Sequence, residues 1–332
     1  MTQSGNDAQA IAQAAQTLQS GGLVAFPTET VYGLGADASS DKAVAKIFAA
    51  KGRPSDHPLI VHVADASHAL GYASSVPLFA ARLMQAFWPG PLTVILPRKP
   101  GVASAAAGGQ DSIGLRCPAH PVALAFLRAS LALGVNGVAG PSANRFGRVS
   151  PTTAQHVRDE FGDAVLVLDG GPCEVGIESC IVDCTRSQPV LLRPGVLTLA
   201  QLEAACGEPV LDKDDKRLTQ TESPRASGTL ESHYAPNARV RLMDTKAIQT
   251  ALDLLGAEAA HIAVYARTIV RIKSSHIVYR RMPDDALAAA QQLFAELRDF
   301  DDKAVKLIWV ETLPDDVAWD GVRDRLQRAA AA

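Results

Sequence analysis

The sequence has no apolar segment at its start and no large excess of either charge. Residues 1–19 are polar and rich in alanine, without an apolar core or a cationic beginning, so they predict neither a signal peptide nor a membrane-spanning helix. The net charge of −3 gives no general attraction for nucleic-acid phosphates. We therefore expect a cytoplasmic protein with no membrane partner and no strong affinity for nucleic acid.

The cysteines lack the spacing of a disulfide scaffold. There are 5 of them in 332 residues, and none forms a C-x-x-C pair. Cys173, Cys180 and Cys184 are close enough in sequence to suggest a structural zinc site, but no histidine lies near them. Reduced thiols and no protein-bound metal are expected.

The common nucleotide-binding motifs are also missing. No G-x-x-x-x-G-K-[ST] sequence occurs, which excludes an ordinary P-loop. Residues 33–38 fit G-x-G-x-x-A, but 6 residues separate Phe26 from Gly33, whereas a dinucleotide-binding glycine follows its strand at once. A nicotinamide-dependent dehydrogenase is therefore the least favoured interpretation.

What is present is an alternation of strand and helix patterns, typical of an α/β fold. The length exceeds the roughly 150 residues of one average domain, which favours two domains. We expect a catalytic domain at 8–205, a polar linker at 206–238 and a smaller Rossmann-like α/β domain at 239–332. Helices are predicted at 8–18, 41–50, 78–87, 121–129, 153–161, 198–205, 247–255 and 286–297. Strands are predicted at 23–26, 59–63, 92–96, 112–116, 138–140, 165–168, 180–183, 190–193, 240–243, 262–265 and 307–310.

Between the strand predicted at 23–26 and the helix predicted at 41–50, Phe26–Asp37 reads as a ligand-contacting loop, because it combines hydroxyls, a carboxylate, a proline and two glycines. Lys51 and Arg53 follow as two neighbouring cations. Several later strand ends carry hydroxyls or an arginine beside glycine or proline, at 114–116, 140–144, 176–179 and 192–195. Open α/β sheets bind ligands where strand ends converge, so these segments predict a site for a small anion.

These segments resemble the threonylcarbamoyl-AMP synthase family, whose N-terminal part is a YrdC-like domain with a twisted mixed sheet and flanking helices. The similar segments are PTETVYGLGADA at 27–38, KGRPSDHPL at 51–59, WPGPLTVIL at 88–96, IGLRCPAHP at 113–121, GPSANRFGRVSPTTAQHV at 140–157, DGGPCEVGIES at 169–179 and LLRPG at 191–195. SHYAPNA at 232–238 looks like the linker of the two-domain members.

The resemblance implies a nucleotidyltransferase that joins L-threonine, bicarbonate or CO2, and ATP into L-threonylcarbamoyl-AMP and pyrophosphate. A separate tRNA threonylcarbamoyltransferase machinery would use the product, and tight tRNA binding by this chain is not expected. Mg2+ is expected with ATP, held mostly by phosphates and water because no dense carboxylate cluster is visible.

The resemblance also implies residue roles. The catalytic cations would be Lys51 and Arg53. The threonine-binding residues would be Thr30, His62, Arg116, Gly140 and Ser179. The ATP-binding residues would be Arg53, His57, Ser112, Ser142, Ser150, Arg193 and Tyr234.

Several of these residues have a purely structural alternative. Lys51 and Arg53 could simply be cations that stabilise a helix C-terminus. His62 lies in an apolar strand, where a histidine is commonly a residue of the buried core. Ser142 could cap its own turn, and Tyr234 could pack the linker against a domain. Thr153 is left out of the site as a helix cap.

Two positions depart from the family pattern, and two other functions remain open. Cys180 replaces a hydroxyl residue after the GIES serine, and Ser232 replaces an arginine before the His-Tyr pair. A hydrogenase-maturation carbamoyltransferase would need an acylphosphatase-like part and C-x-x-C motifs, which this chain lacks. An RNA-binding module would bind tRNA in a salt-sensitive way.

Overall fold

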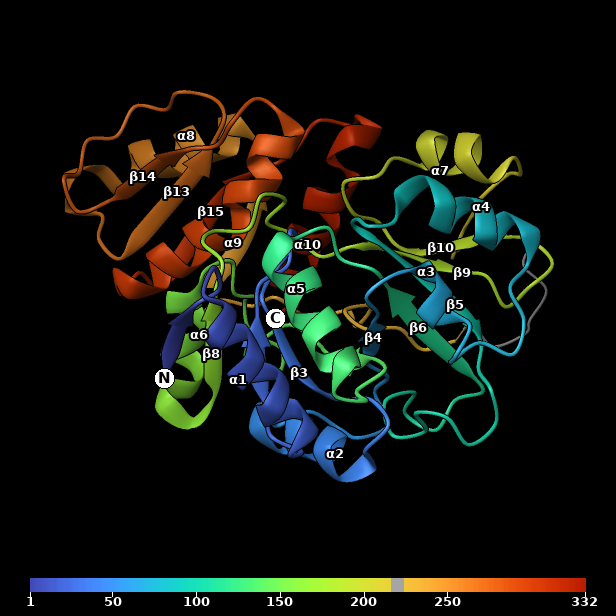
Figure 1. The fold of residues 1–332 in the computed structure, drawn as a ribbon. Coiled ribbons are helices and arrows are strands. Elements are labelled where there is room, and N and C mark those ends of the chain that lie inside the picture. Colours follow the sequence, from blue (N-terminus) through green and yellow to red (C-terminus); the bar gives the residue numbers. More distant parts are fainter. Residues whose placement is uncertain (216–223) are drawn as a thin grey trace. The chain divides into compact units, whose positions relative to one another are not determined.

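The chain folds into two compact units. The computed structural model describes residues 1–215 and 224–332, so part of the predicted linker lies outside the described residues. Unit 1 contains 1–146 and the described part of 150–229, and unit 2 contains 147–149 and 230–332 (Figure 1). The described residues between 206 and 229 thus belong to unit 1.

Unit 1 is built on a mixed sheet of eleven strands. The strands are β1 (Thr2–Ser4), β2 (Val24–Phe26), β3 (Gly33–Asp37), β4 (Ile60–His62), β5 (Leu92–Pro97), β6 (Ser112–Arg116), β7 (Val138–Ala139), β8 (Leu166–Asp169), β9 (Cys180–Asp183), β10 (Val190–Arg193) and β11 (Leu211–Asp212). Their order is β1-β8-β2-β3-β7-β4-β6-β5-β9-β10-β11, with parallel and antiparallel neighbours. This confirms the predicted mixed sheet.

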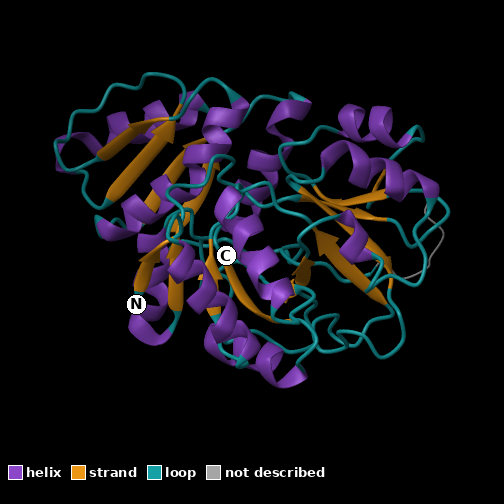
Figure 2. Cartoon of the chain, viewed as in Figure 1, coloured by secondary structure: helices purple, strands orange, loops and turns teal. Residues whose placement is uncertain are grey.

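Helices flank this sheet (Figure 2). They are α1 (Ala8–Gln19), α2 (Asp41–Lys51), α3 (Ala66–Ala69), α4 (Leu78–Phe87), α5 (Pro121–Ala132), α6 (Ala154–Phe161), the short 3-10 helix η1 (Gly162–Ala164) and α7 (Leu199–Cys206). Helix α1 packs against α5, and α4 packs against α7 (Figure 1). Thr153 caps α6 by accepting a hydrogen bond from the His156 amide, as predicted.

The segment predicted to be a ligand loop contains a central strand. Gly33–Asp37 forms β3, which pairs antiparallel with β2 and with β7. A Cβ on Gly33 would lie 3.0 Å from the Phe26 ring, and one on Gly35 would lie 2.7 Å from the Val138 side chain. The loop prediction was wrong for these five residues, because glycines that make room for Phe26 and Val138 also remove the apolar pattern of a strand.

Unit 2 has a parallel four-stranded sheet in the order β12-β15-β13-β14. Its strands are β12 (Arg239–Met243), β13 (Ile262–Ala266), β14 (Val278–Arg281) and β15 (Leu307–Glu311). Its helices are α8 (Thr245–Leu255), η2 (Gly256–Glu258), α9 (Ala286–Asp302), η3 (Val317–Trp319) and α10 (Asp320–Ala330). The prediction of a smaller Rossmann-like domain is confirmed. No helix in the described ranges combines the length and apolar character needed to cross a bilayer.

Candidate active site

Arg116 ends strand β6 and makes a buried network with the PTET segment. Its Nη2 donates to Glu29 Oε1 at 2.7 Å, its Nη1 to Thr30 Oγ1 at 2.8 Å and its Nε to the Gly90 carbonyl at 3.2 Å. Glu29 Oε2 accepts from the Ala119 amide at 3.1 Å. These contacts use three of the five guanidinium N–H groups. No acceptor is found for the other two within the described part of the chain.

His62 is brought beside this arginine by strand register. Parallel pairing of β4 with β6 sets His62 directly opposite Arg116. Burial and the Arg116 charge lower the pKa of His62 to about 3, so its ring is neutral at physiological pH. Its Nδ1 is buried and has no hydrogen-bond partner among the described residues. A buried, unpaired nitrogen is costly, which makes this atom a candidate ligand contact.

Gly140 lies against the same ring. A Cβ at Gly140 would approach His62 Nδ1 to 3.3 Å and the Phe26 ring to 3.4 Å. The absence of a side chain therefore leaves the space next to Nδ1 open.

Arg193, at the end of β10, contacts Ser179, the residue before β9. Arg193 donates from Nε and Nη2 to the Ser179 carbonyl, at 3.1 and 2.9 Å. The Ser179 hydroxyl is 2.8 Å from Thr93 Oγ1 on β5. Since β9 pairs with both β5 and β10, the sheet itself joins these three residues.

Lys51 and Arg53 diverge because α2 ends between them. Gly52 adopts a left-handed conformation with φ 65° and caps the helix. Lys51 turns inward, where Nζ donates to the Ser142 carbonyl at 2.6 Å and to the Asn144 carbonyl. Burial, followed by the nearby Arg53 charge, lowers the pKa of Lys51 well below its usual value. Lys51 thus holds the turn that carries Ser142.

Arg53 contacts a different part of unit 1, at Pro58, Phe146 and Ser227. Its Nη2 donates to the Pro58 carbonyl at 2.9 Å and to Ser227 Oγ at 3.2 Å. Its guanidinium lies 5.7 Å from the Phe146 ring centre, and the His57 ring contacts that same ring edge-on at 5.5 Å. Burial and then Arg53 lower the pKa of His57. Arg53 and His57 are therefore neighbours through Phe146.

Ser150 is paired with a carboxylate. Its Oγ donates to Glu178 Oε1 at 2.5 Å, and both residues are buried. Because Glu178 precedes Ser179 in the chain, this bond connects Ser150 to the segment that contains Ser179.

Ser112 lies in unit 1 and Tyr234 in unit 2. Ser112 begins β6 and shares the face of Gly114 and Arg116, since alternate strand residues point to one side. Tyr234 belongs to unit 2, where its buried ring packs on Phe294 with centroids 5.4 Å apart. Its assignment to ATP stays a prediction.

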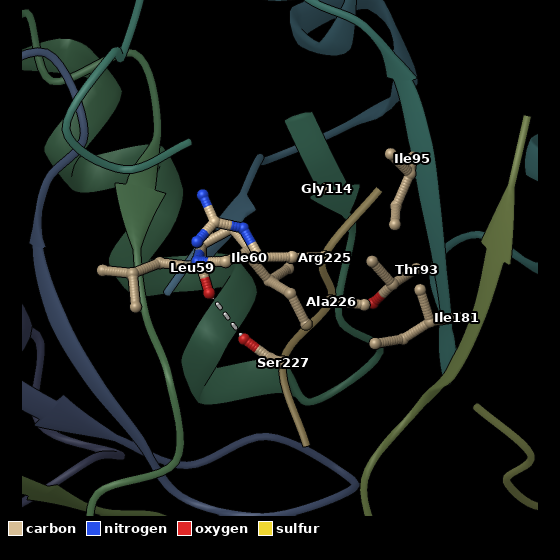
Figure 3. A pocket seen from close by; sticks show the side chains of 10 residues that line it. Leu59, Ile60, Thr93, Ile95, Gly114, Ile181, Arg225, Ala226 and Ser227 are labelled. Carbon is tan, nitrogen blue, oxygen red and sulfur yellow. Dashed lines mark hydrogen bonds between the residues drawn. The ribbon is translucent and has the colours of Figure 1, made fainter. Parts of the chain in front are cut away.

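A small pocket adjoins Arg53 and Arg193 in unit 1. It is lined by residues of β4, β5, β6 and β9 and by the segment Arg225–Ser227 (Figure 3). The lining residues are Pro58, Leu59, Ile60, Thr93, Ile95, Gly114, Ile181, Arg225, Ala226 and Ser227.

Four of the residues that hold this site together were not predicted. Three of them lie inside segments that resemble the family, namely Glu29, Thr93 and Glu178. Glu29 and Glu178 each precede a predicted site residue in the chain. Ser227 carried no signal beyond its place in a polar stretch. Among the described residues, no group of three His, Cys, Asp or Glu could hold a metal ion.

Comparison with known proteins identifies both parts of the chain. Residues 16–195 match a family model described as "Telomere recombination", which covers the Sua5, YciO and YrdC proteins, and residues 197–331 match "Threonylcarbamoyl-AMP synthase, C-terminal domain". The threonylcarbamoyl-AMP synthase of Bacillus subtilis is 41% identical over 333 residues, covering 98% of this chain and 94% of that protein. The synthase of Pyrococcus abyssi is 36% identical, covering 96% of this chain and 93% of that protein.

A solved structure matches as well. Pyrococcus abyssi Sua5, crystallised in complex with L-threonine, has a TM-score of 0.87 and 35% identity, covering 98% of this chain and 95% of that chain. The match spans both units and confirms the family resemblance. The chain belongs to the threonylcarbamoyl-AMP synthase family.

Proposed function

We propose that this protein makes L-threonylcarbamoyl-AMP and pyrophosphate from L-threonine, bicarbonate or CO2, and ATP. The product would then serve a separate machinery that modifies tRNA. The observation that carries the proposal is that Arg116, the neutral His62 and Ser179 are buried in the same sheet. Arg193 lies on strand β10 of that sheet, and both Arg193 and Arg53 contact Ser227.

The Arg116 corner suits an amino acid. The two remaining N–H groups of Arg116 would bind the threonine carboxylate, while Glu29 and Thr30 hold the guanidinium plane. His62 Nδ1 and the Ser179 hydroxyl would contact the polar groups of threonine. Gly140 leaves room for the substrate beside the His62 ring.

The Arg53 corner suits a nucleotide. Arg53 and Arg193 are cations whose planar groups match phosphate oxygens, and Lys51 orders the turn bearing Ser142. His57, Ser112, Ser150 and Tyr234 are the further ATP-side residues of this proposal.

The reaction balances as an addition followed by a displacement. The threonine amine adds to the carbon of CO2 and loses a proton, which gives a carbamate. From bicarbonate, the same carbamate forms with loss of water and no net release of a proton. A carbamate oxygen then bonds to the α-phosphorus of ATP, and the bond from that phosphorus to the bridging oxygen breaks, so that pyrophosphate leaves. Both reactants are anions, so Arg53 and Arg193 would lower the barrier by offsetting the charge.

Mg2+ would arrive with ATP. Since no cluster of metal-binding side chains is found in the described part of the chain, phosphate oxygens and water would supply most of its ligands.

The test is synthesis from ATP labelled in the α-phosphate, with threonine, bicarbonate and Mg2+. We expect threonine-dependent formation of a labelled adenylate and an equal amount of pyrophosphate. Arg53→Ala should fold normally yet lose nearly all synthesis. Failure of the wild-type protein to form the adenylate would reject the proposal.

A further inference from the structure

The segment Arg225–Ser227 is docked on unit 1 by specific contacts. The Gln110 amide holds the backbone of Arg225 on both sides: Oε1 accepts from the Arg225 amide at 2.7 Å, and Nε2 donates to its carbonyl at 3.2 Å. The Arg225 guanidinium pairs with Asp56 at 2.7 Å. Paired amide contacts fix the register of this segment, although the surrounding sequence has the composition of a linker.

Ser227 engages both arginines of the proposed nucleotide site. Its carbonyl accepts from Arg193 Nη1 at 2.7 Å, and its hydroxyl accepts from Arg53 Nη2 at 3.2 Å. The same hydroxyl donates to the Pro58 carbonyl at 2.8 Å. A phosphate oxygen carries negative charge, so it is a stronger partner for a guanidinium than a neutral carbonyl or hydroxyl.

Ala226 lies over the apolar pocket next to these arginines. Figure 3 shows the segment passing between Ile60 and the side chains of Thr93 and Ile181. Ala226 also packs on the buried cluster that contains Ile95 and Ile181. An apolar slot with a glycine, Gly114, in its wall suits the flat face of a heteroaromatic base.

We infer that Arg225–Ser227 is an internal competitor of ATP. In the docked position, Ala226 occupies the surface for the base, and Ser227 occupies the guanidinium groups for the phosphates. ATP binding displaces the segment. The apparent Kd for ATP therefore equals the intrinsic Kd divided by the fraction of molecules in which the segment is undocked. This inference rests on the proposed function, because it requires ATP to bind at Arg53 and Arg193.

The first test is ATP affinity in the full-length chain, measured by calorimetry with Mg2+ and without threonine. Gln110→Ala and Ser227→Ala each remove side-chain contacts that hold the docked segment, so each should lower the Kd for ATP at least about threefold, equivalent to roughly 0.7 kcal/mol. Gln155→Ala and Ser74→Ala, which alter a glutamine and a serine elsewhere in unit 1, should leave the Kd unchanged. An unchanged or raised Kd in both test variants would overturn the inference.

The second test follows the segment itself by hydrogen exchange in the wild-type protein. Saturating ATP should speed exchange of the Arg225 amide, which Gln110 protects when the segment is docked. Trypsin should likewise cut faster after Arg225. Slower exchange on adding ATP would mean that the segment closes onto the nucleotide instead, contradicting competition. If no protein in the series binds ATP, the proposed function itself fails, and this result is distinct from ATP binding with an unchanged Kd.

Discussion

Arg116 is the residue on which the buried polar contacts of Glu29, Thr30 and Gly90 converge. A single buried carboxylate, Glu29, offsets its charge and fixes its plane, and the Ala119 amide fixes the carboxylate in turn. Removing one partner of such a pair leaves the other charge buried and unpaired, which is expensive. Glu29 is therefore a positioning residue that acts through Arg116.

Glu29→Gln should raise the KM for threonine about tenfold, a loss of roughly 1.4 kcal/mol, and leave the KM for ATP within about twofold. The physical reason is that an NH2 group replaces one of the two carboxylate oxygens. This NH2 group must face either Arg116 Nη2 or the Ala119 amide, and both of these are hydrogen-bond donors. Steady-state kinetics with each substrate varied in turn is the measurement. Glu174→Gln, at an exposed carboxylate in the 169–179 segment, is the matched control. An equal rise in both KM values would argue against a role through Arg116.

His62 gives the protein a defined acid sensitivity. Its pKa is about 3 in the folded protein and about 6.5 in an unfolded chain, so between these values the unfolded chain binds more protons. The stabilisation is therefore complete above pH 6.5 and is lost as the pH falls toward 3. Between pH 7.5 and 5 this single group should cost about 2 kcal/mol of unfolding free energy.

Urea denaturation of wild type and His62→Gln at these two pH values measures that contribution. The variant should lose about 2 kcal/mol less than wild type over the interval. His57 and His120, whose pKa values are also lowered by burial, contribute equally to both proteins and cancel in the difference. Identical pH dependence in the two proteins would show that His62 does not titrate as described.

At the scale of elements, strand β3 shows how glycine can mark a buried strand rather than a flexible loop. Gly33 and Gly35 lie against the Phe26 ring, and the strand sits between β2 and β7. Helix α10 is the opposite case. It is not among the helices predicted from the sequence, and it buries the charged residues Arg325 completely and Arg328 almost completely.

Gly35→Ala should destabilise the protein by about 1–3 kcal/mol, because its Cβ would sit 2.7 Å from Val138 Cγ1 and 3.2 Å from the Val24 carbonyl. Gly114→Ala, in the neighbouring region of the same sheet, is the matched control, since its Cβ would be no closer than 3.5 Å to Thr93. The urea midpoint should fall for the first variant and hold for the second. A stable Gly35→Ala protein would contradict the packing described for β3.

At the scale of the whole molecule, two separate stretches of the chain build unit 2, a short one at 147–149 and a long one from 230 onward. Asp301 joins the short stretch to the long one. Its carboxylate accepts from Arg148 at 3.4 Å, from the Asn237 amide at 2.7 Å and from the Ala238 amide at 3.1 Å. Unit 2 therefore depends on a few residues that lie far from the rest of it in sequence.

Asp301→Ala should lower the stability of unit 2 by about 1–3 kcal/mol, because it removes the acceptor of two backbone amides and one of the contacts of Arg148. In a Trp88→Phe background, tryptophan fluorescence reports unit 2 alone, through Trp309 and Trp319. The urea midpoint seen by fluorescence should fall. Asp302→Ala, at the exposed neighbouring position, should not change it, and equal effects would contradict the role of Asp301.

The sequence by itself determined the family, the mixed α/β class and most strand and helix positions, because periodicity, glycine and proline positions and short motifs are local properties. It named Arg116, His62, Ser179, Arg193, Lys51 and Arg53 as site residues, on resemblance and on the chemistry of their side chains. Only the tertiary structure decided that Glu29 holds Arg116, that Lys51 turns inward, that Tyr234 packs in unit 2 and that Ser227 contacts both nucleotide-side arginines. The reason is physical: these contacts join residues far apart in sequence, and burial fixes their partners and charge states.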